Sequence, residues 1–556
     1  MTTFRVGHLF SGVGGGELGF QRAIIRHRGK PVARFETAFA VDFWAEACAA
    51  SERLTGAPAT QMDLVYPDDY LALHGSPPPP GWTPVTARDL YLLSPDPPDV
   101  IFLSPPCKAF SGLLSAARSR EPKYQAMARL ARRGIELACA AWDGRVPLIL
   151  LENVPGIRHR GASLLDEMRV ELRRWGYVLD DRDHDAGRMA GLSQSRMRFL
   201  LVARQPNRCA VPLHRPVEHP LTGIGNTLSR LAPPWTTAGS RLPRHQLPKC
   251  QWQTWLRLAL ISPGADWRAL EKVDAYVVRR RPDGVFIVAA QIDGVEISPP
   301  GWSDDFEYIG HWGRVDRQWM NGTRFDSGFR VRSWGEHVGA LETSNASASG
   351  APYVADPRLS SKDSRHTSHM HNTPWSSPSR TVTGATHVGN GSPVASDPRL
   401  TCTPRGGSYG MIEWSEPAPT IAASIDIHAG RAAVADPRIQ LRPTDRCTPL
   451  VISPWGTFNR PLTTCEISAL QGFTPDEVAR AFGDLSDEKV RQMVGNAVPV
   501  ASAEKIAEEF GTSLAESAGR LPIRFSFPRS RWVAPNRGSE HWRLRSGLRA
   551  RTGGPS

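Results

Sequence analysis

The residues with the clearest chemical potential follow apolar runs in the first part of the chain. Cys107 comes directly after DVIFLSPP, in which the apolar run from Val100 to Leu103 leads into a serine and two prolines. A single cysteine is more often a small buried hydrophobic residue than a nucleophile. The prolines restrict this loop, however, and a strand would deliver it to the carboxyl edge of a sheet, where open α/β sheets bind ligands. We therefore interpret Cys107 as a candidate thiol nucleophile.

A carboxyl group and two guanidinium groups follow in similar positions. In PLILLENV an apolar run leads into Glu152, Asn153 and Val154, and a carboxyl group that a dry pocket keeps protonated can act as an acid toward a ring nitrogen. GLSQSRMRFLLVA places Gln194, Arg196 and Arg198 at alternating positions that enter a strand. Period-two spacing points Arg196 and Arg198 to one face, where their donors can meet a carbonyl oxygen or a phosphate.

A glycine-rich turn stands near the start of the chain, in HLFSGVGGGELGF. Glycines after a strand allow positive φ angles and let the backbone approach a ligand closely, although such turns are common and are weak signals alone. Asp42 ends the next apolar run, and Asp63 precedes another. A carboxylate at the end of the second strand can accept hydrogen bonds from both hydroxyls of a ribose. The alternative interpretation of these residues is that they are solvated loop aspartates.

The elements that must position these residues alternate between strand and helix. Apolar runs predict buried strands, and alanine-rich stretches between them predict helices. This alternation predicts an α/β layer with a largely parallel sheet. The expected strands are Phe4 to Phe10, Phe35 to Val41, Val100 to Leu103, Leu148 to Leu151 and Phe199 to Ala203, and the expected helices include Trp44 to Leu54 and Tyr124 to Trp142.

The character of the chain changes from Gln205 to Pro454, where Pro, Gly, Ser, Thr and Trp dominate and turn signals are frequent. An Asp-Pro-Arg repeat with a period of about forty residues suggests stacked supersecondary units, which serve either as turns between β-hairpins or in nucleic-acid binding. Helical character returns at Glu466 to Gln471 and Ala501 to Phe510. The repeat occurs at Ala355 to Arg358, Ser396 to Arg399 and Ala435 to Arg438, and the segments after it begin at Trp375, Trp414 and Trp455.

Composition limits the class of protein. The formal charge of +12 and the pI near 9.6 favour a polyanionic partner. The eight cysteines show no CxxC pair and no spacing typical of zinc, so we expect reduced thiols and no metal. No apolar run is long enough to cross a bilayer, and no secretory signal begins the chain, which predicts a cytoplasmic protein. The arginine-rich end, from Arg520 onward, is expected to be a disordered basic tail.

Six motifs in order carry a resemblance to a known family. They are SGVGGG, PPCKAFS, ENV, QSRMR, RPLTTCEISALQGF and VGNAVP, and they extend from Phe10 to Pro499. The chain resembles the DNA cytosine-C5 methyltransferases, which depend on S-adenosylmethionine. Each motif is short, but six in the family's order are very improbable by chance. The resemblance covers nearly the whole chain apart from the tail.

The resemblance assigns roles to individual residues. It makes Cys107 the nucleophile and Glu152 the acid at N3 of cytosine, with Arg198 on the base's O2 and Arg196 supporting the loop. The implied cofactor pocket consists of Phe10, Ser11, Gly12, Gly14, Asp42, Phe43, Asp63, Pro106, Asn496, Ala497 and Val498. Because the last three of these residues come from far along the chain, the C-terminal helix is expected to return and complete the first domain.

Two departures from the family pattern affect the expected cofactor site. His8 stands where the family usually has Asp, just before the glycine turn. This leaves the anchoring of the cofactor at that point open. Asp89 rivals Asp63, because the proline-rich segment from Ser76 to Pro84 resembles an insertion between them.

The resemblance implies a Rossmann-like methyltransferase fold with a large, mostly β or irregular target-recognition domain. It divides the chain into a catalytic domain (1–204), a recognition region (205–454), a segment that completes the catalytic domain (455–515) and the tail (516–556). The implied activity is methylation of specific double-stranded DNA by a monomer in a bacterial or phage-infected cytoplasm. RNA cytosine methylation, transfer of a modified one-carbon group and a catalytically silent DNA-binding regulator remain as alternatives.

Overall fold

The computed structural model describes most of the first 312 residues and the segment from residue 449 to residue 524. Most of the Asp-Pro-Arg repeats, the segments from Trp375 and Trp414, and the tail from residue 525 lie outside the described residues. The described ranges are 1–111, 117–247, 252–263, 265, 267–282, 284–312, 331–332, 353–354, 411–413, 417, 433–436, 449–483 and 485–524.

The first sheet contains every strand that the apolar runs predict. Its parallel strands lie in the order β4, β3, β1, β5 and β6, with β8 antiparallel to β6 and β7 at the edge beside β8. Counted along the chain, the parallel strands follow the 3-2-1-4-5 order of doubly wound nucleotide-binding sheets. Its strands are β1 (Thr2–Leu9), β2 (Ile24–His27), β3 (Lys30–Asp42), β4 (Ala59–Gln61), β5 (Val100–Leu103), β6 (Leu148–Asn153), β7 (Val178–Asp185) and β8 (Met197–Arg204).

Both faces of this sheet are covered, which explains why its central strands are continuously apolar. On β5, Ile101 and Leu103 belong to the core beneath α5 and α7, whereas Val100 and Phe102 belong to the core beneath α1 and α15. The predicted α/β class with a Rossmann-like sheet is confirmed. The helices of this part are α1 (Gly15–Arg22), α2 (Ala45–Thr55), α3 (Tyr70–His74), α4 (Ala87–Leu93), α5 (Pro122–Ala141), α6 (Ile157–Arg160), α7 (Ala162–Arg174) and α8 (Ala186–Ala190).

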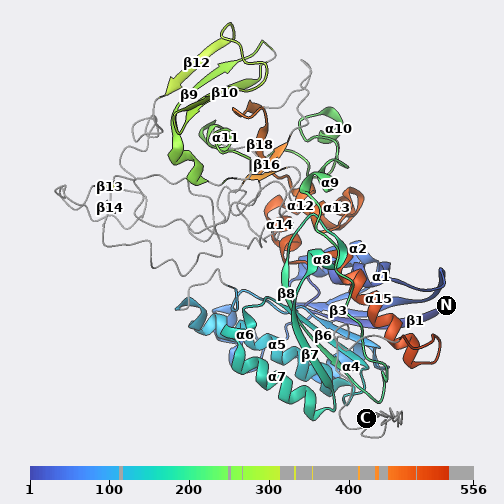
Figure 1. The fold of residues 1–556 in the computed structure, drawn as a ribbon. Helices are drawn as coiled ribbons and strands as arrows, with labels where there is room; N and C mark the ends of the chain where they lie inside the picture. The colour runs from blue at the N-terminus through green and yellow to red at the C-terminus, as the bar shows by residue number, and fades with distance from the viewer. Residues whose placement is uncertain are drawn as a thin grey trace, which may run out of the picture.

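The C-terminal helices pack on the first part of the chain. A Cβ added at Gly19 would lie 2.5 Å from Cβ of Ala503, so α1 and α15 approach so closely that only glycine fits there. Figure 1 shows α15 alongside α1, with α12, α13 and α14 between the two sheets. These helices are α12 (Thr464–Leu470), α13 (Pro475–Phe482), α14 (Asp487–Asn496) and α15 (Val500–Ser517).

A second, mostly antiparallel sheet follows (Figure 1), in the order β12-β9-β10-β17-β18-β16-β15, with β11 beside β10. Trp255 and Phe458 stack at the centre of its apolar core, with ring centroids 5.7 Å apart. β13 (Val331–Arg332) and β14 (Tyr353–Val354) pair separately. The other elements are α9 (Ile224–Leu228), α10 (Thr237–Ser240), α11 (Trp252–Ala259), β9 (Val273–Arg280), β10 (Phe286–Ile292), β11 (Val295–Ile297), β12 (Glu307–Trp312), β15 (Met411–Glu413), β16 (Ala433–Asp436), β17 (Val451–Ile452) and β18 (Phe458–Pro461).

Candidate active site

The loop that carries Cys107 is held on both sides. Ser104 donates through its backbone N to the Leu9 carbonyl at 3.2 Å and through Oγ to the Phe10 carbonyl at 3.0 Å. Asn153 Nδ2 donates to the carbonyl of Pro105 at 3.4 Å. Beyond the cysteine, the backbone N–H groups of Phe110 and Ser111 donate to the Cys107 carbonyl at 3.0 and 3.1 Å. Cys107 therefore follows a braced loop, next to the glycine turn and to the end of β6.

Glu152 and Arg198 form an ion pair at the ends of adjacent strands. Arg198 Nε lies 2.7 Å from Glu152 Oε1, and the two side chains are only 7% and 11% exposed. Arg198 Nη1 donates to the Met197 carbonyl at 2.7 Å. Glu152 is thus buried, as a dry pocket requires, and a guanidinium group contacts its carboxyl group directly. The ion pair fixes the two side chains relative to each other.

Arg196 is buried beside this pair and reaches the C-terminal segment. Its Nη2 donates to the Gly495 carbonyl at 3.2 Å. Burial raises the pKa of the Cys107 thiol, while the positive charges of Arg198 and Arg196 act to lower it. Burial also lowers the pKa of Arg196 to about 9, which still leaves the guanidinium charged near neutral pH. The structure thus brings Cys107, Glu152, Arg196 and Arg198 within electrostatic reach of one another.

Asp185 organises the turn before β8, a role that the sequence reasoning missed. Its Oδ1 accepts from the backbone N–H groups of Gly187 at 2.9 Å and Arg196 at 2.8 Å, and its Oδ2 accepts from Ser195 Oγ at 2.7 Å. Asp185 is also the N-cap of α8. An aspartate directly before the helix-permissive sequence AGRMA is a helix-capping signal, and this signal could have identified Asp185 from the sequence. Gln194 completes the turn by donating to the Leu470 carbonyl and Gln471 Oε1.

The glycine turn meets the end of β3 through Asp42. Gly12 N donates to Asp42 Oδ2 at 2.9 Å, and Trp44 N donates to Oδ1 at 3.0 Å. Burial raises the pKa of Asp42, although these backbone bonds oppose the rise. Phe10 has a φ of 58°, an uncommon conformation for a residue with a side chain and one that often occurs at functional sites. Ser11 N continues the pairing by donating to the Val41 carbonyl at 3.1 Å.

Open space surrounds this turn on the side where a ligand would lie. A Cβ added at Gly12 would meet no atom within 4 Å, whereas one at Gly14 would lie 2.4 Å from Ser51 Oγ. The Phe43 side chain, beside Asp42, is 54% exposed. Each Asp42 oxygen retains a second lone-pair site for a hydroxyl group. These features suit a nucleoside: a carboxylate for its ribose and an aromatic side chain for its base.

The C-terminal segment lies against the same turn. A Cβ added at Gly15 would lie 2.6 Å from the Val498 carbonyl oxygen and 3.1 Å from Ala497 Cβ. Asn496, the last residue of α14, is exposed, while Ala497 and Val498 are buried. Residues nearly five hundred positions apart therefore meet at the glycine turn.

The two candidate aspartates on either side of the proline-rich segment have local partners. Asp63 Oδ2 lies 2.7 Å from Nε2 of His74, and its Oδ1 accepts from Val65 N at 3.2 Å. Asp89 accepts from the backbone N and Oγ1 of Thr86, both at 2.7 Å, as the third residue of a capping box. Asp89 is thus used to begin α4. The carboxylate of Asp63 is shared with His74, and the choice of Asp63 over Asp89 for the cofactor stays a prediction.

His8 is buried under the turn rather than exposed at it. Its ring packs against Phe20 and Phe102, with centroid distances of 5.6 and 5.8 Å. Within the described part of the chain, Nε2 has no hydrogen-bond partner. Burial lowers the pKa of His8 to about 3, so the imidazole is neutral at physiological pH. His8 therefore acts as a packing residue in this structure.

Three general features complete the description of the chain. Cys48, Cys107, Cys139, Cys209 and Cys465 are free thiols. Across the residues that the structure describes, no group of three or more His, Cys, Asp or Glu side chains could hold a metal ion. None of the helices in these residues has the length and apolarity needed to cross a membrane.

Comparisons with known proteins agree in the reaction class that they name. The sequence profile of the C-5 cytosine-specific DNA methylases matches residues 4–226. The type II methyltransferase M1.BsuMI of Bacillus subtilis (strain 168) is 32% identical over 105 residues, which are 19% of this chain. The match spans only 23% of the length of that relative, about a quarter.

Two solved structures align over most of the chain at low identity. The Entamoeba histolytica methyltransferase EhMeth is 12% identical with a TM-score of 0.40, covering 92% of this chain and 99% of its own. A putative DNA modification methyltransferase encoded within an E. coli prophage is 16% identical with a TM-score of 0.41, covering 92% and 100%. The family match itself spans the glycine turn, the Cys107 loop, Glu152 and both arginines. Residues 4–226 are therefore a C-5 cytosine-specific DNA methylase domain.

Proposed function

We propose that this protein methylates C5 of cytosine in double-stranded DNA with S-adenosylmethionine as the methyl donor. The observation that carries the proposal is the convergence of a braced cysteine loop, a Glu152–Arg198 ion pair and Arg196 at the end of one sheet, beside a glycine turn. A thiol, a carboxyl group and guanidinium donors are the groups needed to activate a pyrimidine ring. The methylase profile over residues 4–226 supports the same reaction.

The residues around the glycine turn fit the cofactor. Asp42 would hold the ribose hydroxyls, and Phe43 would contact the adenine. The backbone from Phe10 through Ser11 and Gly12 to Gly14 would lie close to the cofactor, because this segment has positive φ angles and an open side. Asp63, Pro106 and the segment from Asn496 to Val498 would complete the pocket. When bound, S-adenosylmethionine supplies an electrophilic methyl group for C5.

The Cys107 thiolate would begin the reaction by adding to C6 of cytosine. The new S–C6 bond displaces the C5–C6 π electrons toward N3, where Glu152 provides a proton or a hydrogen bond and so stabilises the resulting enamine. C5 becomes nucleophilic as a result. After C5 has been methylated, loss of its proton restores the double bond and expels the thiolate.

Arg198 would hold the base by its O2. Its Nε forms an ion pair with Glu152 at 2.7 Å, and its Nη1 donates to the Met197 carbonyl. The remaining Nη2 would bind the carbonyl oxygen of the base without release of Glu152. Arg196 would support Cys107 by its positive charge, which acts to lower the pKa of the thiol.

The target base must leave the duplex before Cys107 can reach C6, at a cost of a few kcal/mol. We propose that the region from residue 205 to residue 454 reads the flanking sequence. The expected boundary at residue 455 moves to about residue 462, because β18 pairs within the second sheet, and residues 462–515 would complete the catalytic domain. We also propose that the protein acts as a monomer in the cytoplasm.

RNA methylation by the same chemistry is the second candidate, because the thiol, carboxyl and guanidinium groups of the site would act in the same way on a cytosine of RNA. The two are separated by incubating the protein and S-adenosylmethionine with duplex DNA or with RNA, then analysing nucleosides by mass spectrometry. We expect 5-methylcytosine in the DNA sample and none in the RNA sample. 5-Methylcytidine in RNA alone would contradict the proposal.

A further inference from the structure

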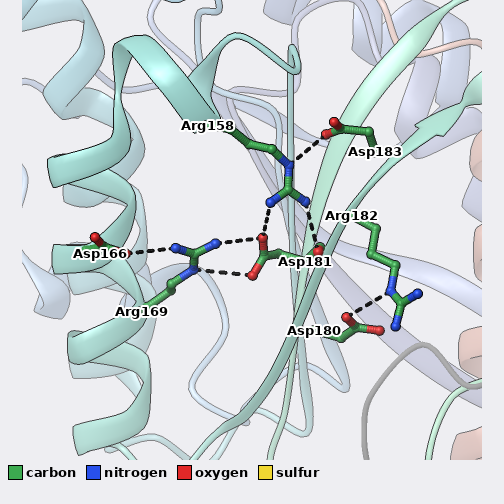
Figure 2. A network of polar contacts seen from close by, with 7 residues as sticks. All are labelled: Arg158, Asp166, Arg169, Asp180, Asp181, Arg182 and Asp183. Atoms are coloured by element: carbon green, nitrogen blue, oxygen red, sulfur yellow. Dashed lines mark hydrogen bonds and ion pairs between the residues drawn. The ribbon is translucent and has the colours of Figure 1, made fainter.

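Charged side chains gather along the edge strand β7 (Figure 2). This strand pairs with β8, so that Asp183 lies opposite Phe199 and His184 opposite Arg198. Arg158 from α6 binds Asp183 through Nε at 3.1 Å and Asp181 through Nη1 at 2.8 Å, and its Nη2 donates to the Asp181 carbonyl at 2.9 Å. Arg169 from α7 binds the other side of Asp181, at 3.2 and 2.7 Å. Two arginines from different helices therefore share one carboxylate.

The two arginines differ in what else they touch. Arg169 extends to Asp166 on its own helix, at 2.7 Å. Arg158 instead lies over the ring of Phe199, with its guanidinium carbon 4.7 Å from the ring centroid, which is within cation–π range. Phe199 is buried, pairs with Asn153 on β6 and with Asp183 on β7, and directly follows Arg198. Of the two arginines, Arg158 is the one that contacts the side chain next to Arg198 on β8.

The short helix of Arg158 also touches the loop of Cys107. A Cβ added at Gly156 would lie 2.1 Å from the Phe110 carbonyl oxygen, and one at Gly161 would lie 2.5 Å from the Phe110 ring. Arg160 Nη1 donates to the Ser111 carbonyl at 2.6 Å. The segment from Gly156 to Gly161 thus follows Glu152, packs against the Cys107 loop and is tied by Arg158 to β7 and β8.

We propose that Arg158 is a positioning residue for the reaction. It holds α6 against β7 and Phe199, and thereby keeps Glu152, Arg198 and the Cys107 loop in their productive arrangement. The inference rests on the proposed function, because the step that it aligns is attack on the base. Misplacement of reacting groups by about 1 Å can reduce a rate by about a hundredfold.

The experiment compares Arg158→Met with Arg169→Met, since both variants remove an arginine from Asp181 and only the first uncovers Phe199. Each full-length variant is mixed with duplex DNA containing 5-fluorocytosine and S-adenosylmethionine, and the rate of covalent complex formation is measured in a single turnover. We expect Arg158→Met to lower this rate about 10- to 100-fold with unchanged S-adenosylmethionine affinity. Arg169→Met should stay within about twofold of the wild type.

Conservative variants separate alignment from folding. Arg158→Lys should restore part of the lost rate, because an ammonium keeps one ion pair but not the flat contact with the ring. If Arg158→Met does not fold, Asp183→Asn serves instead, with Asp166→Asn as its matched control. Equal rates for the members of a matched pair, or a wild-type rate in folded Arg158→Met, would overturn the inference. Failure of the wild type to form a complex would count against the proposed function instead.

Discussion

The two sheets of this protein place their buried charges differently. On the first sheet, the Glu152–Arg198 pair lies at strand ends and is 11% and 7% exposed. On the second sheet, Arg460 of β18 pairs with Glu466, and both side chains are 0% exposed. Buried charges interact strongly and require specific partners. The pair that keeps some exposure lies beside Cys107 and has the properties of a reaction centre, whereas the fully enclosed pair joins the second sheet to α12 and has the properties of a structural contact.

The strongest way to break this comparison is to remove the nucleophile. Cys107→Ser should lower methyl transfer by about 10⁴-fold or more, because a hydroxyl is a far weaker nucleophile than a thiolate near neutral pH. S-Adenosylmethionine affinity should remain, since the glycine turn is unchanged. Transfer of tritiated methyl groups to DNA and calorimetric binding measure the two. Full activity of the variant would refute the role of Cys107.

A large substitution in the second sheet should have a different consequence. Trp255→Ala removes a buried ring that stacks on Phe458, at an expected cost of about 3–5 kcal/mol in the free energy of unfolding of that part. DNA selectivity should be lost while S-adenosylmethionine binding persists. Bisulfite mapping and a cofactor titration report these outcomes. Equal loss of both would mean that the two sheets do not function separately.

Asp42→Asn tests the cofactor side of the first sheet. The amide replaces one carboxylate oxygen by a donor, which opposes both the backbone N–H bonds and a ribose hydroxyl. We expect S-adenosylmethionine to bind about 10- to 100-fold more weakly, in line with a hydrogen bond to a charged group. Asp89→Asn is the control and should leave the affinity unchanged, because Asp89 caps α4.

The smallest expected effect concerns acid stability. His8 has a pKa of about 3 in the folded chain, below the ordinary value of 6.5, so the unfolded chain binds a proton more readily. Stability should therefore fall as the pH drops below about 6.5, by about 2 kcal/mol at pH 5 from this residue. His8→Phe should reduce that loss, as measured by urea unfolding at pH 7.5 and pH 5. A variant with the wild-type acid sensitivity would contradict this origin.

Sequence patterns predicted the elements whose formation depends on apolar burial. Val100 to Leu103 was expected as a strand and is β5, because four successive apolar residues suit a strand that is covered on both faces. β7, in contrast, was not predicted. Every residue from Asp180 to Asp185 is charged or titratable. The strand forms by pairing with β8, and Arg158 and Arg169, from two separate helices, pair with the charge of Asp181.

In the candidate site, too, some features could be predicted from the sequence and others could not. Cys107, Glu152 and Arg198 could be identified because each follows or enters an apolar strand in a short motif, and the structure brings them together. The partners of these residues could not be identified from spacing. The contact of His74 with Asp63 depends on loop conformation, and the hydrogen bond from Arg196 to Gly495 depends on the return of the C-terminal segment. Neither leaves a periodic signal in the sequence.

The central claim, that Cys107 attacks cytosine, is tested most directly by trapping the adduct. In 5-fluorocytosine DNA, the fluorine at C5 cannot leave as a proton, so the thiolate cannot be expelled. The wild-type protein with S-adenosylmethionine should form a denaturant-resistant complex, and peptide mass spectrometry should find the DNA on Cys107. An active enzyme that forms no complex, or a complex through another cysteine such as Cys48, would contradict the account.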